Sequence, residues 1–133
     1  MNNPTPSPPS DSAAQRTARI LVVDDDEDLC LLIEFVLGRA GMDVIRSVEG
    51  AEALRLLDRE PFDAVVLDIM LPGMDGWDLL EELKRRKVPV VILSVLNDSA
   101  SSRRGLLSGA TAYIPKPFQP MDLVKQVQAA LRQ

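Results

Sequence analysis

Acidic side chains stand where two apolar segments of the sequence end. Asp68 follows the aliphatic residues 64–67, and Asp24 and Asp25 follow residues 20–23. Unbroken aliphatic runs of this kind are typical of strands buried on both faces of a parallel sheet. One aspartate after a strand is most often a turn former, but three converging carboxylates repel one another unless a cation joins them. Oxygen ligands without histidine or thiolate favour Mg²⁺, for which Mn²⁺ could substitute.

Two later segments end in polar residues of other kinds. Ser94 follows the apolar residues 90–93, and Lys116 follows residues 112–114 and stands between two prolines. An ammonium and a hydroxyl beside a metal ion would surround a dianionic group such as phosphoryl. A carboxylate that attacks phosphorus in line needs this neutralisation of the phosphoryl oxygens. If the chain brings these residues together, they favour phosphoryl transfer to a carboxylate.

The order of the apolar segments predicts how the polar residues could meet. Strand patterns alternate five times with helical patterns, in which apolar residues recur at i, i+3 and i+4. We expect strands near residues 20–23, 43–47, 64–68, 90–93 and 112–114, and helices near 29–40, 51–59, 76–86, 99–108 and from 120 onward. This alternation indicates an α/β fold with helices on both faces of the sheet. We predict a doubly wound, flavodoxin-like fold, with a five-stranded parallel sheet in the order 2-1-3-4-5.

Length and composition limit the classes of protein. The chain has 133 residues, 46% of them hydrophobic and 26% charged, which suits one globular domain. Its net charge of −5 argues against direct binding to nucleic acid. The absence of histidine excludes Ser-His and Cys-His catalysis, and the single cysteine, Cys30, excludes an internal disulfide. No apolar run approaches the ~20 residues of a membrane span, so we expect a cytoplasmic protein.

Two segments have weak structural patterns. Residues 1–18 are rich in proline and serine and carry little to bury, so we expect a disordered tail before one domain over residues 19–133. The helix expected at residues 99–108 contains serines and an internal glycine, which are poor helix formers.

Four motifs in this chain resemble those of the receiver domain of bacterial response regulators. They are VVDDD (residues 22–26), LDIMLPGMDG (67–76), VPVVILS (88–94) and YIPKPF (113–118). Each motif alone is weak, whereas four in this order at the ends of the first, third, fourth and fifth expected strands are specific. The resemblance implies a phosphoacceptor domain of a two-component system. It also implies a regulatory protein that catalyses only its own phosphorylation and dephosphorylation.

The same resemblance assigns the residues of a metal site. It implies that Asp68 is the phosphoacceptor and that Asp25 and Asp68 bind Mg²⁺ directly. The backbone carbonyl of Met70 would add a ligand, and Asp24 would act mainly through water.

Three further residues take roles by resemblance. Ser94 corresponds to the family's switch hydroxyl, Lys116 to the phosphoryl-binding lysine and Tyr113 to the switch aromatic. We expect a cis Lys116–Pro117 bond, because a sharp turn there would direct the lysine over the site. Val95 stands where the family usually has alanine or glycine, so we expect it to crowd the site and keep Tyr113 turned outward.

The resemblance also implies the partners. A histidine kinase or a phosphotransfer protein would donate the phosphoryl group to Asp68, and phosphorylation would change the surface of the fourth helix, fifth strand and fifth helix. An effector domain or downstream protein would bind this surface, and a second copy of the chain is another candidate. Met70 and Leu96 flank the route of the hydrolytic water in the family, and neither can position water. We therefore expect a long-lived phosphorylated state.

Three other interpretations compete with this one. Alternate aspartates in residues 24–28 suggest a calcium loop, but Leu29 and Phe35 stand where such a loop needs glycine and a bidentate glutamate. The same segment matches part of the motif of haloacid-dehalogenase phosphatases, without its continuation or a cap domain. A pseudo-receiver that binds partners without being phosphorylated is the main alternative, and it depends on Val95.

Overall fold

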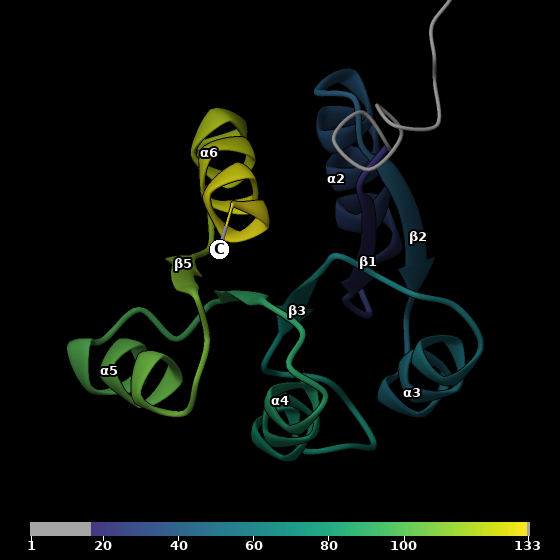
Figure 1. Ribbon diagram of the computed structural model, residues 1–133. Coiled ribbons are helices and arrows are strands. Elements are labelled where there is room, and N and C mark those ends of the chain that lie inside the picture. Colours follow the sequence, from purple (N-terminus) through teal and green to yellow (C-terminus); the bar gives the residue numbers. More distant parts are fainter. Residues whose placement is uncertain (1–16, 133) are drawn as a thin grey trace, which may run out of the picture.

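The computed structural model describes residues 17–132, which contain one parallel sheet of five strands (Figure 1). The strands are β1 (Arg19–Val23), β2 (Asp43–Ser47), β3 (Ala64–Asp68), β4 (Val90–Ser94) and β5 (Ala112–Pro115). Their order is β2-β1-β3-β4-β5, and each neighbouring pair is parallel, which confirms the predicted sheet. The expected tail, residues 1–18, lies outside the described residues except for its last two.

Helices cover both faces of this sheet. They are α2 (Glu27–Arg39), α3 (Gly50–Arg59), α4 (Gly76–Arg85), α5 (Ser99–Leu107) and α6 (Pro120–Leu131), so that the family's fourth and fifth helices correspond to α5 and α6. Helices α2 and α6 lie on one face, and α3, α4 and α5 lie on the other (Figure 1). The doubly wound fold is thereby confirmed. None of these helices is long and apolar enough to cross a membrane.

The strands are buried on both faces, as their aliphatic runs predict. Along β1, Ile20 and Val22 belong to the core beneath α2 and α6, whereas Leu21 and Val23 belong to the core beneath α3 and α4. Every residue of β3 and β4 is buried. Helix α5 is attached more weakly than its neighbours, because Gly105 is its one buried residue.

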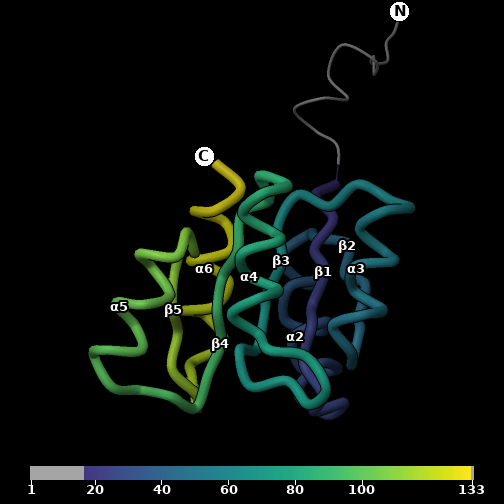
Figure 2. Tube along the Cα trace, turned by 90° about the horizontal axis from the view of Figure 1, so that it is seen from below, coloured from purple at the N-terminus to yellow at the C-terminus, as the bar shows by residue number. Residues whose placement is uncertain are grey.

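The loops at the carboxyl ends of the strands have defined conformations. Asp26, Asp75 and Asp98 cap α2, α4 and α5, since each side chain accepts a hydrogen bond from a backbone N–H two or three residues later. Figure 2, which views the molecule from the side of α3, α4 and α5, shows that these strand ends share the lower edge of the sheet. The polar residues predicted to meet therefore come from one edge.

Candidate functional site

Three carboxylates meet at the carboxyl edge of the sheet. Strands β1 and β3 are neighbours in parallel register, with Val23 opposite Leu67, so the residues that follow lie side by side. One carboxylate oxygen from each of Asp24, Asp25 and Asp68 lies within 4.8 Å of the other two. The predicted convergence of these three residues is present.

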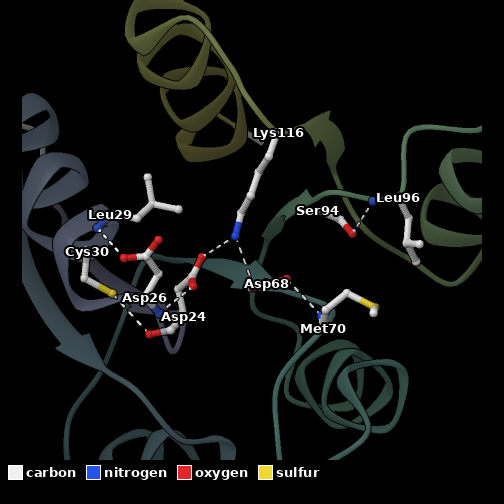
Figure 3. A network of polar contacts seen from close by, with 9 residues as sticks. All are labelled: Asp24, Asp26, Leu29, Cys30, Asp68, Met70, Ser94, Leu96 and Lys116. Carbon is white, nitrogen blue, oxygen red and sulfur yellow. Dashed lines mark hydrogen bonds and ion pairs between the residues drawn. The ribbon is translucent and has the colours of Figure 1, made fainter.

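Lys116 reaches into this acidic cluster from the loop after β5 (Figure 3). Its Nζ donates a hydrogen bond of 2.8 Å to Asp24 Oδ2 and one of 3.1 Å to Asp68 Oδ2. The Lys116–Pro117 peptide bond is cis, as predicted. The side chains of Lys116, Asp24 and Asp68 are only 16%, 2% and 6% exposed. Solvent and salt therefore screen these ion pairs less than they would at the surface.

Burial and the ion pairs act in opposite directions on the charges of the site. Burial raises the pKa of the Asp24 carboxyl, although the hydrogen bond from Lys116 opposes this shift. Burial also disfavours the Lys116 ammonium, but its bonds to Asp24 and Asp68 outweigh that effect and raise its pKa. The lysine is charged at neutral pH and offsets part of the repulsion between the carboxylates.

Backbone and thiol groups hold the two buried aspartates in place. The Met70 N–H donates to Asp68 Oδ1 at 2.8 Å, and the Asp26 N–H donates to Asp24 Oδ1 at 3.0 Å. The Cys30 thiol donates to the Asp24 backbone carbonyl at 3.3 Å, and burial raises the pKa of this thiol to about 11. Cys30 is thus protonated and is no thiolate ligand. No local pattern in the sequence signals this contact.

The donor set of the acidic cluster suits a hard divalent cation. Its three carboxylates supply oxygen only, which is the ligand that Mg²⁺ prefers. Asp24 and Asp68 are buried whereas Asp25 is exposed, so the cluster is open to solvent on one side. Such a position allows a metal ion to keep water or to bind an oxygen of a second molecule.

Ser94 lies at the end of β4, the strand beside β3, and is fully buried. Its Oγ accepts a hydrogen bond of 3.1 Å from the Leu96 N–H, which leaves its own proton free to be donated. The Leu96 carbonyl accepts a hydrogen bond of 2.6 Å from the Tyr113 hydroxyl. Tyr113 is therefore connected to Ser94 through Leu96.

The predicted effect of Val95 on Tyr113 is wrong. The Val95 side chain is 60% exposed and lines a surface groove of about 360 Å³ between α2 and the loop after β5. It does not fill the space beside the phosphoacceptor strand. The Tyr113 ring is not turned outward but is half-buried and packs over Gly105 of α5. Sequence patterns mark Gly105 only as a weak helix former, whereas in the fold it provides the space for this ring.

A doubly wound α/β domain with an acidic strand edge is the architecture of receiver domains, and comparison with known proteins agrees. Residues 20–128 match the family described as response regulator receiver domain. The chain belongs to this family.

Individual relatives support the assignment. The chain is 39% identical over 116 residues to the alkaline phosphatase synthesis transcriptional regulatory protein PhoP of Bacillus subtilis, covering 86% of this chain and 48% of the relative. It is 39% identical over 115 residues to the probable transcriptional regulator ycf27 of Porphyridium aerugineum, with the same shares covered. The chain thus spans about half the length of the curated relatives it matches.

Solved structures agree with the fold in detail. The receiver domain of the Francisella response regulator 1452 superposes with a TM-score of 0.82 at 33% identity, over 87% of this chain and 98% of that one. DrrB, a Thermotoga maritima OmpR/PhoB homologue, superposes with a TM-score of 0.79 at 33% identity, over 87% of this chain and 53% of that one.

Proposed function

We propose that the domain accepts a phosphoryl group on Asp68 from a phosphohistidine of a histidine kinase or phosphotransfer protein. An Asp68 oxygen forms the new bond to phosphorus while the bond from phosphorus to the imidazole nitrogen breaks, and that electron pair returns to the imidazole. The observation that supports this best is the position of Lys116 Nζ, 2.8 Å from Asp24 and 3.1 Å from Asp68 within the acidic cluster. A cation beside a held carboxylate can neutralise the incoming phosphoryl oxygens.

The acidic cluster would hold the metal that this transfer needs. Asp25 and Asp68 would bind Mg²⁺ or Mn²⁺ directly, Asp24 would act through water, and the backbone carbonyl of Met70 would complete the protein ligands. The metal would supply positive charge to the phosphoryl oxygens. The Met70 N–H already orients Asp68 through Oδ1, so the carboxylate is held before any phosphoryl group arrives.

The switch residues would report phosphorylation to the surface. Ser94 would donate its free proton to a phosphoryl oxygen, and Lys116 would bind another. Tyr113 would follow the movement of the loop after β4 and change the α5–β5–α6 surface, where an effector or a second copy would bind. Both curated relatives named above are described as transcriptional regulators, and we propose the same class of output.

The structure does not support the argument from Val95 for a pseudo-receiver. It depended on Val95 blocking the approach to Asp68, and the Val95 side chain points into a surface groove. The acidic cluster, with Lys116 paired to Asp24 and Asp68, supports phosphoryl transfer instead.

Intact-mass spectrometry of the purified domain tests the proposal. Incubation with acetyl phosphate and Mg²⁺ should add the mass of one phosphoryl group, and EDTA should prevent the addition. Asp68→Asn should abolish it, whereas the matched control Asp28→Asn should not, because Asp28 is an exposed carboxylate at the start of α2. Modification that persists in Asp68→Asn, or that proceeds equally with EDTA, would refute the assignment.

A further inference from the structure

An arginine of α5 stacks on the only tryptophan of the chain. The guanidinium carbon of Arg104 lies 4.1 Å from the centroid of the Trp77 ring, within the range of a cation–π contact. Trp77 belongs to α4 and Arg104 to α5, so this contact joins two helices on the same face of the sheet.

The Trp77 side of this contact is fixed to the loop that carries the phosphoacceptor. The backbone N–H of Trp77 donates to Asp75 Oδ1 at 2.9 Å. The preceding residue, Gly76, packs so closely on the backbone of Ile69 that no Cβ would fit there. Ile69 follows Asp68 directly, so the position of the tryptophan is set by the same loop that leaves Asp68.

The Arg104 side of this contact leads to Ser94. The neighbouring Gly105 packs against Tyr113, since a Cβ added to it would lie 2.7 Å from Tyr113 Cδ2. The Tyr113 hydroxyl donates to the Leu96 carbonyl, and the Leu96 N–H donates to Ser94 Oγ. A continuous chain of contacts therefore connects the loop after β3, through α4 and α5, to the Ser94 hydroxyl at the end of β4.

The Arg104–Trp77 contact matters for α5 because other attachments of this helix are few. Gly105 is its one buried residue, and Leu106 and Leu107 are 48% and 77% exposed. An element with so few buried contacts is drawn from the low-stability part of a fold. One stacking contact then contributes a large share of what holds the helix in place.

We propose that Arg104 is a positioning residue, which acts through its stack on Trp77 to hold α5, Tyr113 and Leu96 where Ser94 can donate a hydrogen bond to a phosphoryl group on Asp68. This proposal deepens the proposed function and rests on it, because it concerns the affinity of the site for a phosphoryl-like ligand. Arg104 touches neither the metal ligands nor the phosphoacceptor. Its effect is therefore on the population of the binding-competent arrangement.

Calorimetric titration of the domain with beryllofluoride in the presence of Mg²⁺ measures this population. A cation–π contact at an exposed site corresponds to a factor of about two to five in an equilibrium constant, so Arg104→Ala should weaken beryllofluoride binding about two- to five-fold. The matched control is Arg103→Ala, which removes the same charge from an exposed residue of the same helix. It should leave the affinity unchanged.

A double-mutant cycle separates positioning from a general loss of packing. Trp77→Leu should weaken binding, and Arg104→Ala should have little further effect in that background, because the two residues act through one contact. Arg104→Lys, which keeps the charge but stacks less well, should fall between wild type and Arg104→Ala.

The outcomes distinguish this inference from the function on which it rests. If the wild type binds beryllofluoride and Arg104→Ala matches Arg103→Ala, or binds more tightly than wild type, the positioning role is wrong while the phosphoacceptor function stands. Additive effects of the Arg104 and Trp77 variants would also overturn it. If the wild type does not bind beryllofluoride, the proposed function itself fails.

Discussion

Two glycine-to-alanine substitutions in helices should have opposite effects on stability, because Gly105 packs against Tyr113 whereas Gly38 faces open space. A Cβ at Gly105 would lie 2.7 Å from Tyr113 Cδ2 and 3.0 Å from Ile92 Cδ1. Overpacking of this kind costs about 1–3 kcal/mol, whereas alanine gains about 1 kcal/mol over glycine as a helix former. Gly105→Ala should therefore lower the free energy of unfolding by roughly 0–2 kcal/mol. At Gly38 of α2 an added Cβ meets nothing within 4 Å, so Gly38→Ala should raise it by about 0.5–1 kcal/mol.

Urea denaturation followed by Trp77 fluorescence measures both changes. The two variants carry the same chemical change in helices, so their difference isolates the clash with the ring. In a Tyr113→Ala background the clash with the ring is removed and only the 3.0 Å contact with Ile92 Cδ1 remains, so Gly105→Ala should destabilise less than it does in the wild-type background. Equal stabilisation by the two glycine substitutions in the wild-type background would refute the inward packing of Tyr113.

Three further predictions concern the site and its lifetime. Burial raises the pKa of Asp24 above its ordinary value of 3.8, so the stability that this residue contributes is present at low pH and is lost as the pH rises through the raised value. Without metal, the Asp24→Asn variant should not show this loss and should be more stable than wild type at neutral pH. Equal urea unfolding profiles of the two proteins across pH would contradict this. Lack of a water-positioning group should slow hydrolysis of the aspartyl phosphate by roughly 10- to 100-fold, or ~1.4–2.7 kcal/mol. Loss of label from the phosphorylated domain without kinase should therefore be slow, and it should be faster in Met70→Asn and Leu96→Glu. A wild-type half-life of seconds would rule out a slow hydrolysis set by these positions. Val95→Ala should change the free energy of unfolding by less than about 0.5 kcal/mol, since Val95 is 60% exposed. It should also leave the NMR chemical shifts of the Tyr113 ring unchanged, and a large change in these shifts would support the hypothesis that Val95 crowds Tyr113.

The fold and the convergence of the polar residues could be predicted because parallel strands impose both. Aliphatic runs define the strands, their alternation with helical patterns defines the sheet, and the carboxyl ends of such strands share one edge. Asp24 and Asp68 could therefore be expected to meet although they stand 44 positions apart in the sequence. Lys116 follows from the same reasoning, since it comes directly after β5.

Side-chain directions in the loops could not be predicted in this way. The orientation of Val95 depends on the turn after β4, which begins with the hydrogen bond from Leu96 to Ser94. The pairing of Trp77 with Arg104 joins residues of two helices and has no local pattern. Gly105 shows the same limit, because a glycine in a weak helical segment does not reveal which ring will occupy the space beside it.

Chemical trapping of the phosphorylated residue shows which aspartate accepts the phosphoryl group. An aspartyl phosphate is an acyl phosphate, and borohydride reduces it to the alcohol, so an aspartate that carried phosphoryl becomes homoserine. After incubation with acetyl phosphate and Mg²⁺, tandem mass spectrometry should find homoserine at position 68 and at no other aspartate. Homoserine at position 24 or 25 in place of 68, or its absence from a domain that has gained a phosphoryl group, would contradict the assignment of Asp68 as the phosphoacceptor.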